Sequence, residues 1–311
     1  MQGRRNSIGK IIAKDLKSFG GAYLLAIPVI VYYILFHYKP ILGAVIAFKD
    51  FKVRQGIWGS KWVGMKHFQN FWGTYSFNRL ITKTLTLSIY SLVAGFPIPI
   101  LLALMLNECG NVKFKKTVQM ITYAPHFIST VVMCSIVLLF ITSGKNGMLN
   151  NFRQALGATE RIDFIAKPNY FANIYVWSGI WQSMGYSSII YIAALSGIDP
   201  SLHEAAVVDG ASKLRRVWHI DLPGIIPTIT ILLILNVGSL MNIGYEKVLL
   251  LQNDLNMSAS DIIATYVYRQ GLENAQYSFS AAVGLFNSVV NTILLVTVNF
   301  ITKKLGETSL F

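Results

Sequence analysis

Long apolar segments separated by polar stretches constrain this chain more than any other feature of its sequence. About 20 mostly apolar residues suffice for one helix to cross the hydrocarbon core of a membrane. Hydrophobic residues make up 53% of the chain and charged residues only 13%, about half the charged share of a typical soluble domain. We therefore expect an all-α membrane protein with six transmembrane helices. The expected spans are residues 19–37, 84–106, 123–141, 172–195, 225–241 and 279–301.

Proline residues and polar stretches set the expected boundaries of these spans. Pro97 and Pro99 should kink the second span, and Pro125 opens the third. The aromatic-rich residues 39–83 are too polar to span and should lie over the membrane surface, whereas residues 107–122 should form a short loop. The first span lacks a small-residue cleavage site, so we expect it to be retained.

The distribution of basic residues favours one orientation in the membrane and argues against nucleic-acid binding. The net charge is +13, but lysine and arginine cluster at the ends of apolar segments rather than along one stripe. That distribution indicates anchoring at lipid headgroups, and no nucleic-acid binding is expected. The shorter connecting segments carry the higher density of basic residues, which favours cytoplasmic termini. We expect a cytoplasmic basic tail (1–18), a first helix with an extracytoplasmic segment (19–83), a membrane core (84–303) and a cytoplasmic tail (304–311).

The titratable side chains do not suggest catalysis. Cys109 and Cys134 are far apart, and the five histidines have no spacing suited to a metal or a catalytic triad. The spans contain no paired carboxylates, and the sequence lacks a Gly-rich phosphate loop of the G-x-x-x-x-G-K-[ST] form. We expect no catalytic residues, no metal site, no cofactor and no ATP hydrolysis by this chain.

The polar stretch 201–223 lies between the fourth and fifth spans. Two helix starts are open: Asp199 can cap a helix that has Pro200 at its first position, or Ser201 and Glu204 can form a capping box. Gly210 can adopt a positive φ and end that helix. A second short helix should end at Leu222-Pro223. Such a helix pair is more elaborate than a connection between spans requires, which suggests a contact surface.

The same stretch resembles the EAA motif of ABC importer permeases, in which E-A-A, three residues, G and nine residues precede I-x-L-P. Every defined position and both spacings match, and the motif precedes the last two of six spans as it does in that family. The matching residues are Glu204, Ala205, Ala206, Gly210, Ile220, Leu222 and Pro223.

The resemblance implies a type I ABC importer permease fold and a permease core over residues 84–303. It implies a second homologous permease subunit, two cytoplasmic ATP-binding subunits and an extracytoplasmic solute-binding protein, all at a bacterial plasma membrane. The helix from Pro200 to Asp209 would be the coupling helix, seated in a cleft of an ATP-binding subunit. Glu204 would pair with a basic group there, and Gly210 would set the turn.

Four further motifs, in residues 38–40, 47–51, 123–129 and 265–271, resemble those of the carbohydrate-uptake branch of this family. The most similar group is the permeases for aldouronate-, oligogalacturonide- and alginate-type oligosaccharides. These motifs imply an oligosaccharide substrate. The alternatives are a permease of the same class for another solute, such as a glycerol phosphate or peptide-like compound, or a stand-alone channel or secondary transporter.

Polar and aromatic residues inside the later spans are candidates for the substrate path, because such groups usually face a bundle interior. Aromatic faces stack on sugar rings, and amides bind hydroxyls. Interfacial anchoring of tryptophan and hydrogen bonding between helices are the alternative interpretations. The candidates are Trp177, Trp181, Gln182, Tyr186, Asn236, Asn287 and Asn291.

The segment before the second span is strongly basic, with eight lysines and arginines against Asp50. A positive outer face attracts anions, which favours an acidic oligosaccharide. Contact with lipid headgroups is the alternative explanation for these basic residues.

Overall fold

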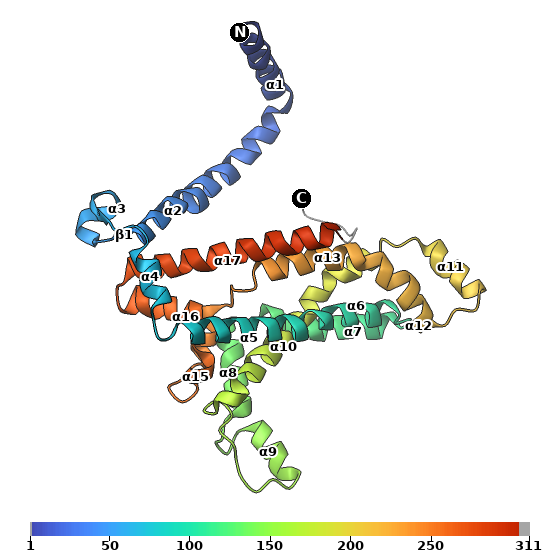
Figure 1. Cartoon of the computed structure of the whole chain (residues 1–311). Coiled ribbons are helices and arrows are strands. Elements are labelled where there is room, and N and C mark those ends of the chain that lie inside the picture. Colours follow the sequence, from blue (N-terminus) through green and yellow to red (C-terminus); the bar gives the residue numbers. More distant parts are fainter. Residues whose placement is uncertain (1, 305–311) are drawn as a thin grey trace.

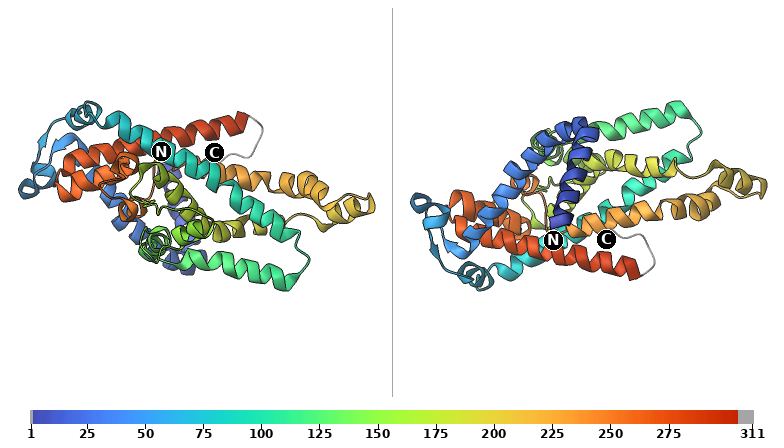
Figure 2. Two further views of the ribbon diagram at one scale, coloured as in Figure 1. Left: turned by 90° about the horizontal axis from the view of Figure 1, so that it is seen from below. Right: turned by 90° about the horizontal axis from the view of Figure 1, so that it is seen from above.

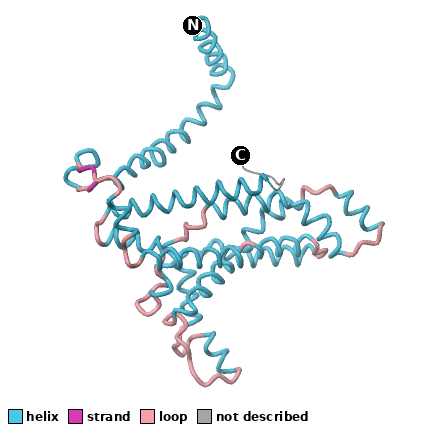
Figure 3. Tube along the Cα trace, in the orientation of Figure 1, coloured by secondary structure: helices cyan, strands magenta, loops and turns pink. Residues whose placement is uncertain are grey.

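The computed structural model describes the backbone of residues 2–304 and the side chains of residues 18–304, and most of it is helical (Figure 3). Within that range, two short strands form the one sheet. β1 (Lys49–Asp50) pairs antiparallel with β2 (Lys61–Trp62), in the register that puts Lys49 opposite Trp62. The all-α expectation is confirmed.

The N-terminal rod projects away from the other helices (Figure 1). α1 (Gln2–Tyr33) continues through η1 (Ile34–Tyr38), α2 (Lys39–Ile41) and η2 (Leu42–Phe48), with non-helical backbone angles at Phe19. Residues 18–48 are long and apolar enough to span a membrane, yet no residue of their most apolar window is buried. This surface therefore needs lipid or another subunit to cover it.

A small cap joins the rod to the rest of the chain. It holds β1, η3 (Val53–Gln55), α3 (Gly56–Gly59), β2 and α4 (Lys66–Trp72). The Lys49 ammonium donates to the Ile57 carbonyl at 2.8 Å, and the Phe51 amide donates to the Ser278 hydroxyl at 2.9 Å. The first bond ties β1 to α3, and the second ties the Ala47–Phe51 motif to the start of the last helix.

The second span is longer than expected. α5 (Phe77–Gly95) and α6 (Pro97–Asn107) together form one candidate span of 31 residues. The helix is interrupted at Phe96, because Pro97 and Pro99 lack the N–H groups from which the carbonyls four residues earlier would accept hydrogen bonds.

The expected loop over residues 107–122 is wrong. α7 (Val112–Tyr123) is a regular helix whose first turn is capped by the Asn111 side chain, which accepts from the amides of Lys113 and Phe114. η4 (Ala124–Phe127) extends α7, and α8 (Thr130–Ile141) follows at an angle of 106° to this extended helix. Pro125 and the Ser129 cap of α8 account for the bend. α8 has 12 residues, about 18 Å of helix and too short to span alone.

The central helix of the molecule is α10 (Pro168–Leu195), which follows α9 (Met148–Ala155). It packs against α5, α6, α7 and against α13 (Leu222–Gly238). Its polar residues keep it outside the set of helices that are apolar enough to span. In the described part of the chain, four helices are long and apolar enough to span a membrane, or five if the bent pair α7–α8 is one span.

The polar stretch 199–221 lies at the far end of the molecule from the β1–β2 cap (Figures 1 and 2). It contains α11 (Pro200–Val208), α12 (Lys213–Arg216) and η5 (Val217–Asp221). The expected helix stop at Leu222-Pro223 is wrong: α12, η5 and α13 form one run from Lys213 to Gly238. The π-helical turn η5 precedes Pro223, which lies in the first turn of α13, where a proline is tolerated.

The C-terminal part folds back on the core. α14 (Tyr245–Leu251), α15 (Met257–Ser260), α16 (Ile263–Tyr268) and η6 (Arg269–Glu273) lead into α17 (Tyr277–Lys304), which lies along α13. Arg269 hydrogen-bonds Asp261, and Arg79 of α5 lies 3.6 Å from the same carboxylate. The Thr265–Gly271 motif thus helps fix α16 to the start of the second span.

Candidate functional site

The first candidate site is the capped helix α11. The Asp199 carboxylate accepts from the Ser201 amide at 2.9 Å, so Asp199 is the cap and the alternative capping box is not formed. This hydrogen bond holds the pKa of Asp199 below its usual value. Gly210 has φ +74°, its amide donates to the Val207 carbonyl and the Ala211 amide donates to the Ala206 carbonyl. That bonding pattern is a Schellman motif, in which glycine best tolerates the left-handed residue.

α11 exposes apolar side chains around much of its circumference. Leu202, Val207 and Val208 are 52%, 55% and 87% exposed. Glu204 and Ala205 are exposed beside them. Exposed aliphatic residues next to one carboxylate and a small residue are suited to close contact with another protein.

His203 ties α11 to the helices behind it. His203 lies 3.3 Å from the buried carboxylate of Asp221, which also accepts from Asn107 at 3.4 Å. Glu108 and Arg216 form an ion pair at 3.2 Å next to them. His203, Asp221 and Glu108 could each offer one metal-ligand atom within 4.8 Å, but the Arg216 guanidinium already neutralises Glu108. The cluster links α11 to the end of α6 and the start of α13.

The remaining motif residues continue this link. Ile220 lies in η5, and Leu222 and Pro223 begin α13. Asp209 is the C-cap of α11 and is exposed. A Cβ on Gly224 would lie 2.6 Å from the Ile198 side chain, so the glycine permits close approach of α13 to the end of α10.

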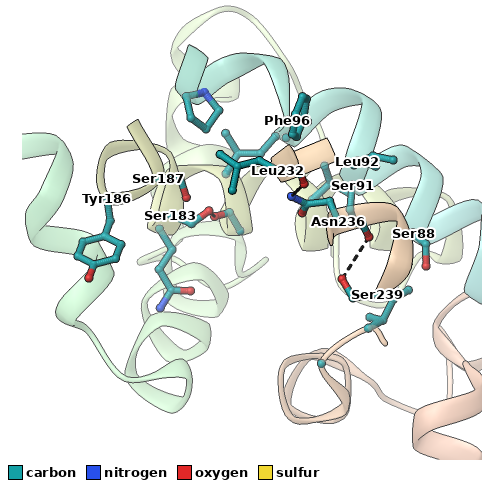
Figure 4. Close-up of a pocket in the computed structure, with 18 of the residues that line it drawn as sticks. Ser88, Ser91, Leu92, Phe96, Ser183, Tyr186, Ser187, Leu232, Asn236 and Ser239 are labelled. Atoms are coloured by element: carbon teal, nitrogen blue, oxygen red, sulfur yellow. Dashed lines mark hydrogen bonds between the residues drawn. The ribbon is translucent and has the colours of Figure 1, made fainter. Parts of the chain in front are cut away.

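The second candidate site is a cavity of about 810 Å³ between α5, α6, α10, α13 and residues 239–247. Serine hydroxyls and side-chain amides lie among its aliphatic and aromatic walls (Figure 4). Hydroxyls and amides can both donate and accept hydrogen bonds, which suits a polyhydroxylated ligand. Its polar lining residues are Ser88, Ser91, Gln182, Ser183, Ser187, Asn236, Ser239, Asn242 and Lys247.

Three of the expected substrate-path residues line this cavity: Gln182, Tyr186 and Asn236. Gln182 donates to the Ile128 carbonyl at 3.0 Å, and the Tyr186 ring stacks on His126 at 3.8 Å between centroids. Both contacts involve the 123–129 motif, which therefore supports the cavity wall.

The other four expected residues lie elsewhere. Trp177 donates to the Tyr90 hydroxyl at 3.0 Å and is 53% exposed, and Trp181 is 40% exposed. Asn287 donates to the Asn242 side chain at 3.0 Å, and Asn291 accepts from the Met241 amide at 2.9 Å. The two asparagines hold the segment that follows α13, beside the cavity rather than in its wall.

Lys247 is a charged residue of the cavity that the sequence did not single out. It lies between the expected fifth and sixth spans, and only the fold brings it to α10. The available signal was a lone lysine before the apolar run Val248 to Leu251, which indicates a short helix with one buried face.

Comparison with known proteins agrees with this architecture. Residues 71–307 match the family model described as "Binding-protein-dependent transport system inner membrane component". The chain belongs to this family of transport permeases.

Curated relatives resemble the permease over most of its length. "Protein LplB" of Bacillus subtilis (strain 168) is 43% identical over 289 residues, covering 93% of this chain and 90% of the relative. "Polygalacturonan/rhamnogalacturonan transport system permease protein YteP" of the same organism is also 43% identical over 289 residues, covering 93% and 89%.

Solved structures resemble the permease as well. One is described as the "Crystal structure of a bacterial ABC transporter involved in the import of the acidic polysaccharide alginate". Its matching chain has a TM-score of 0.86 and 38% sequence identity, covering 94% of this permease and 98% of that chain. A second structure of the alginate transporter, in complex with an alginate pentasaccharide-bound periplasmic protein, also matches with a TM-score of 0.86.

Proposed function

We propose that this permease forms half of the translocation path of an ATP-driven, binding-protein-dependent importer of acidic oligosaccharides. The observation that carries the proposal is α11, a helix capped at both ends that exposes aliphatic side chains and is tied through His203 and Asp221 to α13. ATP hydrolysis takes place on two separate cytoplasmic subunits, and α11 transmits their movement to the membrane helices.

In this coupling role, each motif residue has a specific function. Glu204 faces a basic group of an ATP-binding subunit, and Ala205 and Ala206 permit close approach. Asp209 and Gly210 fix the turn that follows. Ile220, Leu222 and Pro223 pass the displacement into α13, since α12, η5 and α13 are one continuous helix.

The membrane topology follows from this placement. We infer six spans, with the bent pair α7–α8 as the third and the polar helix α10 as the fourth. Residues 1–18 and 304–311 are cytoplasmic tails, residues 19–83 hold the first helix and the extracytoplasmic cap, and residues 84–303 are the permease core. A bacterial plasma membrane is the location.

A second homologous permease completes the path. The rod formed by residues 18–48 has no buried residue in its most apolar window, and the cavity lies between helices of a single subunit. A partner permease and membrane lipid together would cover the exposed rod and the open side of the cavity. A solute-binding protein would deliver the sugar at the extracytoplasmic cap.

The substrate class rests on chemistry and on similarity. The cavity offers hydroxyls and amides for sugar hydroxyls, with Gln182, Tyr186 and Asn236 among its lining. Trp177, Trp181, Asn287 and Asn291 then support the surrounding helices. The names of two similar proteins refer to galacturonan and alginate, which are acidic polysaccharides. The basic segment before the second span, with eight lysines and arginines against Asp50, suits an anionic cargo.

Affinity purification of the tagged permease from its native membranes tests the assembly. We expect an ATP-binding subunit and a second permease to co-purify, because α11 exposes apolar area that a monomer leaves unpaired. Purification of the permease alone under several mild detergents would contradict the proposal.

A further inference from the structure

Lys247 brings a positive charge to a cavity that is otherwise neutral. It extends from α14, which begins after Gly244 and returns the chain to α10. Among the described residues that line the cavity, Lys247 is the one cation, and none is an aspartate or a glutamate. A charged group in a wall of hydroxyls, amides and apolar side chains sets the electrostatic preference of the whole cavity.

α10 holds the ammonium group in place. The Lys247 Nζ donates to the Tyr175 carbonyl at 2.6 Å and lies 4.5 Å from the centroid of the Tyr175 ring. A Cβ on Gly179 would lie 3.0 Å from the same nitrogen, so a glycine at this position leaves room for the ammonium. One of three ammonium donors is used, and two remain for a ligand.

The charge of Lys247 has no counter-ion in the described part of the chain. The ion pairs there involve Asp261, Asp221 and Glu108, and none of them includes Lys247. Its neighbour Glu246 is exposed, and the other titratable groups close to Lys247 are the Cys134 thiol and the Tyr175 phenol. A partly buried ammonium without a carboxylate is electrostatically unfavourable unless an anion arrives to pair with it.

We propose that Lys247 is a carboxylate-binding residue of the cavity, which pairs with a uronate carboxylate of the passing oligosaccharide. The nearby hydroxyl and amide side chains, such as Ser183 and Asn242, bind the sugar hydroxyls. A lysine presents a compact point charge on a flexible stem rather than a planar fork. That geometry suits a ligand that must leave again after binding. This inference rests on the proposed function and names the chemistry of its cavity.

Charge-specific substitution tests this assignment in the complete transporter, reconstituted with its binding protein in proteoliposomes. The probes are trigalacturonate and its carboxyl-reduced, neutral counterpart. Lys247→Gln keeps an N–H donor for the Tyr175 carbonyl but removes the charge, and Lys247→Arg keeps the charge. Lys61→Gln is the matched control, because Lys61 is an exposed cation on β2 outside the cavity.

We expect Lys247→Gln to lower trigalacturonate uptake about tenfold or more, because a charge-assisted hydrogen bond is lost. Lys247→Arg and Lys61→Gln should retain most of the uptake. If the wild type carries the neutral probe, its uptake should be unchanged in Lys247→Gln.

Two results overturn the assignment: normal trigalacturonate uptake by Lys247→Gln, or equal losses in the Gln and Arg variants. Equal losses of both probes in the Gln variant also do so, because they indicate a packing role. If Lys247→Gln does not assemble, Gly179→Ala replaces it, since the added methyl group displaces the ammonium. A wild-type transporter that imports neither probe refutes the proposed function instead.

Discussion

At the scale of single residues, the protonation state of Lys247 gives a pH prediction. Burial lowers the pKa of Lys247 from 10.5 to about 8, so the group is charged below about pH 8 and neutral above it. Uptake of an acidic oligosaccharide should therefore fall as the pH rises from about 7 to about 9. The arginine of Lys247→Arg stays charged over this range.

The measurement is the ratio of wild-type to Lys247→Arg uptake across that pH range. Cys134 on α8, Tyr175 on α10 and Glu246 on α14 are the nearby titratable groups. They are present in both proteins, and their titration should cancel in the ratio. We expect the ratio to decline around pH 8. Parallel pH profiles would contradict a role for the Lys247 charge.

Some of these features are predictable from the sequence and others are not, because only the predictable ones depend on neighbouring residues. The Asp199 cap and the left-handed Gly210 are local, so their residue types and spacing predicted them. Lys247 was missed because its contact with Tyr175 joins residues 72 positions apart. Trp177 and Trp181 share a helix face as expected, but that face turns away from the cavity lining.

At the scale of elements, the crossing of α7 and α10 depends on Gly185. A Cβ at this position would lie 2.1 Å from the Thr122 carbonyl oxygen, so the two helices touch through backbone. Gly185→Ala should destabilise the permease by about 1–3 kcal/mol, the usual effect of overpacking.

Thermal unfolding of the purified complex checks this prediction, with Gly284→Ala as the control. Gly284 lies within α17, and a Cβ there would meet nothing within 4 Å. Gly185→Ala should lower the midpoint temperature, whereas Gly284→Ala should not. Equal midpoints for the two variants would show that the crossing tolerates a side chain.

Element boundaries were less predictable than element types. Lys113, Lys115 and Lys116 made residues 107–122 resemble a loop, but the Asn111 cap and the exposed position of α7 accommodate these charges in a helix. The polar residues of α10 gave no sign that it is the central helix. They are polar because they line the cavity. The continuous helix from α12 into α13 is not predictable from Leu222-Pro223, because a proline usually ends a helix, whereas here Pro223 follows the π-helical turn η5.

At the scale of the whole molecule, the chain has the form of one part of an assembly. The apolar rod of residues 18–48 and the aliphatic side chains of α11 are both uncovered, and the two elements lie at distant ends of the structure (Figure 1). Composition predicted membrane insertion, and the spacing of one motif predicted the family. The cavity and its charge could not be predicted, since they arise only where five helices meet.

ATP-driven uptake of labelled trigalacturonate by the reconstituted transporter tests the central claim most directly, with Glu204→Lys beside the wild type. Glu160→Lys is the control, because Glu160 is an exposed carboxylate outside α11, on the loop after α9. We predict uptake by the wild type and Glu160→Lys, and at least an approximately tenfold loss in Glu204→Lys, since reversing one charge of a docked pair is strongly unfavourable. Membrane levels of the permease should be equal in all three. Unchanged uptake by Glu204→Lys would contradict the account that α11 couples ATP hydrolysis to import.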